Sequence, residues 1–323
     1  MRNLGNNISK ILLKMKVDKL ARSFLNKKCS VLMYHGVVPD DCPINAWTLV
    51  KENEFRKQMD FLNRYYKVVD IGDLFMGLQD NDSGKPRAVI TFDDGYRNNY
   101  SIAFPILQEY NFRATIFVCS GLLGQTEMAW YDKVIYAIQR SSCTSMAIGN
   151  VNFFFDSPNP SRRWDMIQEL LTHLKMESEE ERSQQADNIV RHLNVPLDQS
   201  ECFELMSAEE ARSLYGSGLV SIGSHTAYHE ILTSISLSQA EDTIHESIRD
   251  LELLIGDAVH YFSYPNGNYN DEIISLLNAA SITHACTTNS GIYSRRNSPY
   301  KIPRIGIGGY DTIDRFATKI CGL

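Results

Sequence analysis

Two adjacent carboxylates, Asp93 and Asp94, directly follow the apolar run 88–92. Side chains alternate along a strand, so these carboxylates would point to opposite faces. By itself, an Asp-Asp-Gly sequence after a strand is typical of a turn in which Gly95 supplies a positive φ. The pair therefore indicates either an ordinary turn or two carboxylates with different chemical tasks.

A second polar stretch follows the apolar run 219–222 and contains His225 and His229, four residues apart. One helical turn would bring both imidazoles to the same side. Two histidines and one carboxylate can hold a divalent metal and leave positions open for water and substrate. A lone histidine pair is weak evidence, but an acidic pair at an equivalent strand end favours a metal site over an incidental pair.

Three further stretches carry polar groups at strand ends or within apolar runs. Residues 261–269 run into a Pro-Asn-Gly turn whose backbone N–H groups could face the same cleft. Arg304 lies alone in the apolar run 301–307, and a buried arginine needs a carboxylate partner. His35 ends the first apolar run. Because all five stretches fall at or within predicted strands, one site could gather them.

The elements that would position these residues alternate between strand and helix patterns. Several strand runs are uniformly apolar, as expected for parallel strands covered on both faces. The alternation predicts an α/β fold with a parallel sheet or barrel. Between about Gly121 and Tyr215 the pattern is helical with few strand signals, which predicts a helical insertion over one end of the sheet. The expected strands are 30–34, 88–92, 114–118, 219–222, 261–264 and 282–285, and the expected helices are 52–66, 102–110, 238–255 and 271–280.

Charge and cysteine usage restrict the class of partner. The chain has 323 residues and a net charge of −7, yet residues 1–28 hold eight basic side chains and one Asp, so the remainder is strongly acidic. An acidic body argues against nucleic acid as a partner. The seven cysteines are scattered and never spaced CxxC, which favours a reducing compartment.

The basic leader, residues 1–28, has a helical apolar stripe and two interpretations. It could pack on its own domain, which we favour, or make peripheral contact with an anionic membrane surface. No run is apolar enough to cross a bilayer, and the leader lacks a secretory pattern. We therefore expect a cytoplasmic location, with the inner membrane face as the alternative. The stripe is Leu13, Val17, Leu20 and Phe24.

Three motifs, in order along the chain, resemble those of the polysaccharide deacetylases, carbohydrate esterase family four: Thr91-Phe-Asp-Asp-Gly95, Ser224-His-Thr-x-x-His229 and Tyr264-Pro-Asn-Gly267. The stretches 32–37 and 302–305 resemble the exopolysaccharide branch of that family. The resemblance covers roughly residues 30–310 outside the insertion. It implies a distorted (β/α)7-type barrel over residues 29–323, and metal-dependent hydrolysis of the N-acetyl group of an amino sugar.

The resemblance also assigns roles. It implies that Asp93 is the catalytic base and that a backbone N–H near Asn266 stabilises the oxyanion. The expected ion is Zn²⁺, with Co²⁺, Ni²⁺ or Mn²⁺ as alternatives. We expect Trp130 and Tyr131 to form a cleft wall. The implied metal ligands are Asp94, His225 and His229, and the expected substrate contacts are Tyr264, Pro265 and Trp130.

The sequence departs from the usual family pattern at two places. Ser263 stands where an arginine usually orients the base, so we predict that Arg304 reaches Asp93 from a neighbouring strand. The usual Leu-x-x-His near the C-terminus is absent from residues 307–313. The exopolysaccharide branch suggests His35 as the general acid, and a purely structural histidine is the alternative.

Three functions remain open on the sequence alone. The first is deacetylation of an N-acetylated glycan or of a lipid-linked or nucleotide-linked biosynthetic intermediate. The second is hydrolysis of another small amide, such as a formamide, on the same scaffold. The third is a non-catalytic glycan-binding relative. The intact base and ligand set favours the first.

Overall fold

The computed structural model describes residues 25, 28–76, 85–177, 179–197 and 201–322. Within them, seven parallel strands close into a barrel, because β1 pairs with both β5 and β13. The predicted distorted (β/α)7-type barrel is therefore confirmed. Its strands, in spatial order, are β1 (Lys28–Tyr34), β13 (Ile302–Gly306), β11 (His284–Ser290), β10 (Tyr261–Ser263), β9 (Val220–Ser224), β6 (Ala114–Val118) and β5 (Arg87–Phe92).

Side chains alternate along each barrel strand, so that one set points into the barrel interior and the other packs against the outer helices. On β1, Leu32 and Tyr34 pack in the outer core, whereas Cys29 and Val31 belong to a separate small cluster. That cluster also contains Val89, Phe117, Cys286 and Ile302, so the interior is apolar along most of its length. The interior positions further along β5 and β13 are polar, which gives the barrel one polar end.

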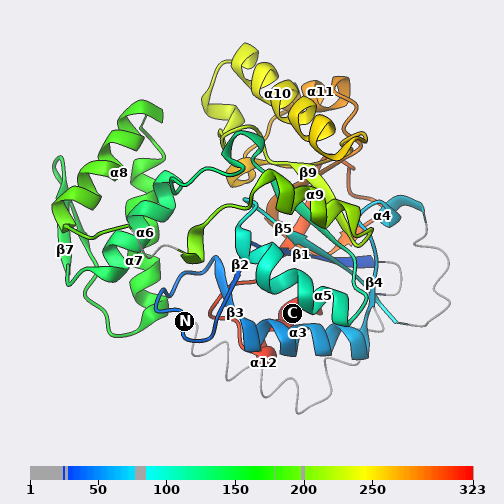
Figure 1. Ribbon diagram of the computed structural model, residues 1–323, viewed down its shortest axis with the longest axis horizontal. Helices are drawn as coiled ribbons and strands as arrows, with labels where there is room; N and C mark the ends of the chain where they lie inside the picture. The colour runs from blue at the N-terminus through cyan, green and yellow to red at the C-terminus, as the bar shows by residue number, and fades with distance from the viewer. Residues whose placement is uncertain (1–24, 26–27, 77–84, 178, 198–200, 323) are drawn as a thin grey trace.

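The outer layer consists of helices that pack against the barrel (Figure 1). Their boundaries follow sequence signals: α10 begins after a capping box formed by Ser236 and Gln239, and it ends at Gly256, whose φ is 72°. These helices are α3 (Glu52–Tyr65), α5 (Phe104–Glu109), α9 (Ala208–Gly216), α10 (Leu237–Ile255), α11 (Asp271–Ala279) and α12 (Ile313–Ile320). The short helix α4 (Asp73–Met76) packs through Leu74 against the interior cluster instead.

Short elements complete this body. A π-helical turn, η1 (Asn99–Ala103), opens the predicted helix 102–110, whose α-helical part begins only at Phe104. The short strands are β2 (Gly36–Val38), β3 (Leu49–Lys51), β4 (Lys67–Val68) and β12 (Tyr293–Ser294). The 3₁₀ turns are η2 (Ser120–Leu122), η3 (Glu201–Phe203), η4 (Leu232–Ser234) and η5 (Pro265–Gly267).

Between β6 and α9 the chain forms a lobe beside the barrel, drawn in green in Figure 1. Its helices share a second hydrophobic core that includes Trp164, Ile167 and Phe155. The elements of this lobe are α6 (Trp130–Arg140), β7 (Ser145–Ile148), β8 (Val151–Phe154), α7 (Pro160–Leu174) and α8 (Glu179–Leu193).

Two details of the predicted insertion 121–215 differ from the structure. An antiparallel hairpin, β7–β8, lies within it, whereas the sequence pattern suggested few strands. The run 151–155 is apolar enough for a strand but too short to be distinguished from a buried helix segment. In addition, α9 packs in the barrel's outer core through Ala211 and Leu214, so it belongs with the barrel helices rather than with the lobe.

Two predictions from the sequence concern membranes: a peripheral contact through the leader 1–28, and the absence of a membrane-spanning run. Most of the leader 1–28, including its apolar stripe, lies outside the described residues, so its contact with a membrane stays a prediction. Among the described helices, none is long and apolar enough to cross a bilayer.

Candidate active site

An ion pair between Asp93 and Arg304 lies at the polar end of the barrel. Arg304 Nη1 and Nη2 each donate to one carboxylate oxygen of Asp93 at 2.7 Å. Both residues are buried. Burial would raise the pKa of Asp93, but the charge and hydrogen bonds of Arg304 hold this pKa below its usual value. Asp93 is therefore an ionised carboxylate with a fixed orientation.

Arg304 reaches Asp93 across the barrel interior. Its Nε donates to the carbonyl oxygen of Thr287 on β11 at 2.9 Å, and its Nη2 also donates to Ser263 Oγ at 2.9 Å. The sequence predicted a contact from a neighbouring strand, and this detail is wrong, because β1 lies between β13 and β5. Residues of parallel strands that face the barrel axis can meet without being on adjacent strands.

A second cluster, next to this ion pair, has the composition of a metal site. Asp94, His225 and His229 each offer one ligand atom, and these atoms lie within 4.8 Å of one another. The Nε2 atoms of His225 and His229 lie 3.6 and 3.7 Å from Asp94 Oδ1. One carboxylate oxygen and two imidazole nitrogens that converge in this way fit a divalent transition-metal ion.

The backbone places these three ligands in turns rather than on regular elements. Asp94 has a φ of 71° and His229 a φ of 63°. The prediction that a helical turn joins the histidines is therefore wrong: residues 225–229 form a loop in which Thr226 also has a positive φ. Asp94 also lies outside the strand, in a turn. The different directions of the Asp93 and Asp94 side chains therefore come from this turn and not from the alternation of side chains along a strand. Such strain at several neighbouring positions is typical of functional sites.

Hydrogen bonds and burial prepare the histidines for a metal. The carbonyl oxygen of Ser263 lies 2.7 Å from His225 Nδ1, so this nitrogen carries the proton and Nε2 is left as the ligand atom. Burial lowers the pKa of His229 to about 3, and the nearby His225 acts in the same direction. Burial would raise the pKa of Asp94, yet His225 holds that pKa well below its usual value. For His225, burial would lower the pKa, but its hydrogen bond to Asp94 and the charges of Asp93 and Asp94 raise it, so a metal ion would bind in exchange for the proton on this imidazole.

His35, the predicted general acid, faces the same cavity from the end of β1. Its ring makes an edge contact with Trp47, with the ring centroids 5.5 Å apart. Its Nδ1 is buried and has no hydrogen-bond partner among the described residues. Burial lowers the pKa of His35, although the charges of Asp94 and Asp93 oppose this effect. An imidazole with an unsatisfied nitrogen can exchange a proton with a bound ligand.

These groups surround one cavity of about 560 Å³. The barrel contributes Asp93, the metal cluster and His35, and the lobe contributes one wall. Tyr131 packs its ring on His229, with centroids 5.3 Å apart. The predicted wall residues Trp130 and Tyr131 both line the cavity. The other residues of the lobe that line it are Ile135, Trp164, Asp165, Gln168, Leu171, Lys175 and Arg182.

Of the three site residues predicted at and next to the turn η5, only Tyr264 and Asn266 line the cavity. Asn266, with a φ of 58°, lines the cavity, and Gly267 beside it has no room for a side chain, because a Cβ atom would lie 1.9 Å from Thr288 Oγ1. Tyr264 reaches the wall, but its hydroxyl donates to the carbonyl oxygen of Tyr300. Pro265, the first residue of η5, is buried and is not among the residues that line the cavity, so the structure does not place this predicted substrate contact at the site.

Sequence reasoning missed several residues of the cavity wall. Four of them, Trp164, Gln168, Leu171 and Lys175, are spaced along α7 and its C-cap at helical intervals of four, three and four. This spacing was visible in the sequence as one helix face. The sequence did not show that this helix face is directed toward the metal cluster, because that direction depends on how the lobe packs against the barrel. Trp47, which contacts His35, lies in an irregular loop without any such pattern.

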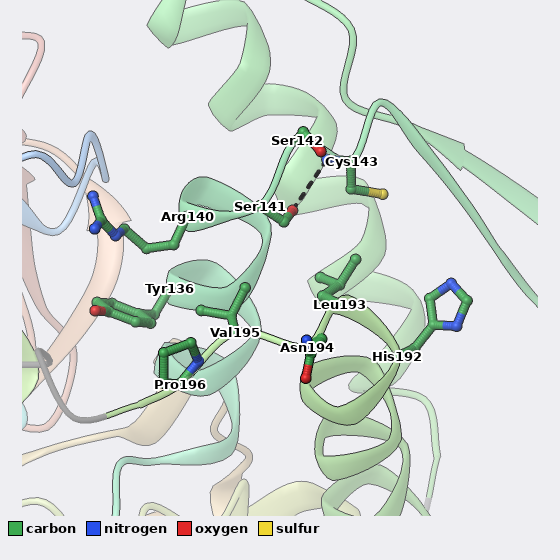
Figure 2. A pocket seen from close by; sticks show the side chains of 10 residues that line it. All are labelled: Tyr136, Arg140, Ser141, Ser142, Cys143, His192, Leu193, Asn194, Val195 and Pro196. Carbon is green, nitrogen blue, oxygen red and sulfur yellow. Dashed lines mark hydrogen bonds between the residues drawn. The ribbon is translucent and has the colours of Figure 1, made fainter.

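A separate cavity of about 530 Å³ lies within the lobe, between the end of α6 and the end of α8 (Figure 2). The N–H of Cys143 donates to Ser141 Oγ at 3.2 Å, and His192 and Arg140 also line this cavity. None of the residues that line it is a carboxylate. The described residues that could hold a metal all belong to the barrel cavity.

Comparison with known proteins agrees with this geometry. The sequence model of the polysaccharide deacetylase family matches residues 80–285, which is more than half of the chain. The chain therefore belongs to the polysaccharide deacetylase family, and it is a hydrolase that acts on carbon–nitrogen bonds. It is 22% identical over 282 residues to the Bacillus subtilis protein YxkH, whose name places it in the same family; the match covers 87% of this chain and 71% of that one.

Solved structures show the same fold. The Streptococcus pyogenes deacetylase PplD, in complex with acetate, superposes with a TM-score of 0.60 at 18% identity, over 91% of this chain and 98% of that one. IcaB from Ammonifex degensii superposes with a TM-score of 0.56 at 16% identity, over 91% and 97% of the two chains. At these identities the likeness establishes the barrel fold and leaves the substrate open.

Proposed function

We propose that this enzyme removes the N-acetyl group of an amino sugar by metal-dependent hydrolysis and releases acetate. The observation that carries the proposal is the arrangement of Asp93. It is an ionised carboxylate fixed by Arg304, and it lies in one cavity with the convergent ligands Asp94, His225 and His229. The name of PplD as a deacetylase and the acetate in its structure support the same chemistry.

Each side chain has a task that follows from its surroundings. The three ligands would hold a divalent ion, most simply Zn²⁺, which when bound activates water and polarises the acyl oxygen. Asp93, which Arg304 keeps ionised and oriented, accepts the proton of the attacking water. His35 is placed to donate a proton to the leaving amine. A backbone N–H of the η5 turn near Asn266 would stabilise the oxyanion.

The walls of the cavity suit a sugar ring. Trp47, Trp130 and Trp164 all line it, and aromatic faces provide a flat apolar surface for the C–H face of a pyranose. The volume of about 560 Å³ is enough for one sugar residue and its substituents. These features support an N-acetylated pyranose, such as N-acetylglucosamine or one of its derivatives, at the metal cluster.

The test measures acetate release by purified protein from N-acetylglucosamine derivatives. We expect activity that is lost with a chelator, returns with Zn²⁺ or Co²⁺, and falls by about 10²-fold or more in Asp93→Asn. The matched control is Asp60→Asn, which changes an exposed carboxylate on α3. Protein loaded with metal that releases formate from N-formyl sugars, but no acetate from N-acetyl sugars, would overturn the proposal in favour of a deformylase.

A further inference from the structure

A hydrogen bond joins the lobe to the η5 turn at the wall of the catalytic cavity. The donor is Nζ of Lys175, the C-cap residue of α7, and the acceptor is Asn266 Oδ1 at 2.6 Å. Both residues line the cavity, although they lie 91 positions apart in the chain. The contact therefore connects a helix of the lobe with the turn that carries the proposed oxyanion donor.

The hydrogen bonds of the η5 turn single out one backbone donor. The N–H of Gly267 donates to the carbonyl oxygen of Tyr264 at 2.8 Å, and the N–H of Asn268 donates to that of Pro265 at 3.4 Å. Pro265 itself has no N–H. Among the described residues, no acceptor bonds the backbone N–H of Asn266. This N–H is therefore the donor of the turn that a substrate oxygen can use.

Several contacts hold the backbone and side chain of Asn266. Its φ of 58° lies in the left-handed region, which costs free energy for a residue other than glycine, although asparagine tolerates it better than most. Its Nδ2 donates to Asn268 Oδ1 at 2.6 Å, and Thr288 Oγ1 donates to its carbonyl oxygen at 3.4 Å. Lys175 is the charged member of this set, and charge-assisted hydrogen bonds are the stronger ones.

The surroundings of Lys175 distinguish this contact from an ordinary surface ion pair. Its side chain is half-buried, and no carboxylate among the described residues forms a salt bridge with it; its Nζ bonds the neutral amide of Asn266. Burial lowers the pKa of the ammonium group, while the charge of Asp94 opposes this effect. Because a desolvated ammonium is costly, its position is better explained by what it does to the turn than by attachment of the lobe alone.

We propose that Lys175 is a positioning residue for the reaction: it holds the side chain of Asn266 and so fixes the N–H of Asn266 in the orientation that the oxyanion requires. This inference rests on the proposed deacetylation. An oxyanion forms when water adds to the acyl carbon, and a donor that is already oriented stabilises it without reorganisation. The lobe is then part of the catalytic apparatus as well as a wall of the cavity.

Kinetics on two substrates separate this role from that of the general acid. Lys175→Met keeps an unbranched side chain and removes the charge. We expect kcat for acetate release to fall about tenfold with KM nearly unchanged, because a misplaced donor affects the transition state more than binding. Hydrolysis of 4-nitrophenyl acetate should fall by a similar factor, since it also passes through an oxyanion, whereas loss of a general acid spares this ester. Lys175→Arg should recover most of both activities.

A double-variant cycle with Asn266→Gly tests whether Lys175 acts through Asn266. Glycine removes the side chain and tolerates the positive φ. We expect Lys175→Met to lower kcat no further once Asn266→Gly is present. Independent losses that multiply in the double variant would overturn the proposal. The control is Arg162→Met, which removes an exposed cation from α7 outside the cavity and should leave kcat unchanged.

Amide hydrogen exchange of the turn gives a readout that needs no turnover. We expect the peptide that contains residues 264–268 to exchange faster in Lys175→Met than in wild type, and at the wild-type rate in Lys175→Arg and Arg162→Met. Circular dichroism establishes that each variant is folded. Unchanged exchange in Lys175→Met would contradict the positioning role. Faster exchange in this variant, with no acetate release by metal-loaded wild-type protein, would support the hold on the turn and count against the deacetylation.

Discussion

Asp93 and Arg304 form a two-point ion pair whose members are separated by 211 positions in the chain. The guanidinium also bonds Thr287 and Ser263, so its plane is fixed by groups on β11 and β10 as well as by the carboxylate. The carboxylate therefore has one orientation and remains ionised, which is what a general base requires.

Arg304→Met leaves the buried carboxylate of Asp93 without its partner. We expect a loss of about 3–5 kcal/mol in the free energy of unfolding, measured by urea denaturation, together with a large fall in kcat. The double variant Asp93→Asn with Arg304→Met should recover part of this stability, because no uncompensated charge remains. Strictly additive losses in this cycle would show that the two side chains are not coupled.

Asp94→Asn removes the anionic member of the metal cluster. We expect purified protein to lose most of its bound divalent ion, as measured by elemental analysis, while circular dichroism stays unchanged. His225→Ala should behave in the same way. The matched control, His245→Gln, alters an exposed histidine on α10 and should keep the full metal content. Wild-type metal content in Asp94→Asn would contradict the ligand assignment.

His35→Ala should separate proton donation from the other steps. Hydrolysis of the amide needs a proton on the leaving amine, whereas 4-nitrophenyl acetate has a leaving group that departs without one. We expect kcat for the amide to fall by about 10²-fold or more, with esterase activity and metal content close to wild type. Equal losses on both substrates would instead point to a structural role through the contact with Trp47.

Asp132 makes stability dependent on pH. Burial raises the pKa of this carboxyl well above its usual value, the charge of Asp94 acts in the same direction, and the Tyr96 hydroxyl, which donates to both oxygens, opposes them. Because the folded-state pKa is the higher one, the protonated group stabilises the fold below the unfolded pKa of about 3.9, and this contribution is lost as pH rises.

Asp132→Asn is neutral at every pH, so it should raise the unfolding free energy at pH 7 by roughly 1 kcal/mol or more. The advantage over wild type should shrink toward zero as pH falls to about 4. Thermal unfolding of both proteins across this range measures the difference. Asp187→Asn, at a partly exposed carboxylate, is the comparison variant. An advantage that grows on acidification would reverse the sign of the argument.

The sequence predicted the parallel strands well because such strands leave a local signature, whereas closure into a barrel was implied by the family resemblance. Runs such as 88–92 and 114–118 are uniformly apolar, and each one became a buried barrel strand. The polar residues after these runs had to meet, because parallel strands bring their carboxyl ends to the same edge of the barrel. This argument brought Asp93, His225 and His35 to one cavity without any knowledge of the closed sheet.

What the sequence could not predict depends on contacts between distant segments. The hairpin β7–β8 has a short apolar pattern that suits a helix or a strand, and packing in the second core decides between them. The position of Lys175 depends on how the lobe meets the η5 turn. Likewise, Arg304 crosses the barrel from beyond the adjacent strand, because the barrel axis and not strand order determines which side chains meet.

The pairing of β1 with both β5 and β13 has a consequence for how the molecule is made. The first barrel strand in chain order cannot complete its hydrogen bonds until Ile302–Gly306, the last one, has been added. Contacts of such long sequence separation form slowly, since a long loop must be closed before they contribute. During synthesis, Asp93 therefore has no arginine partner in Arg304 until the last of the seven barrel strands has been made, so the base is oriented only when the barrel closes.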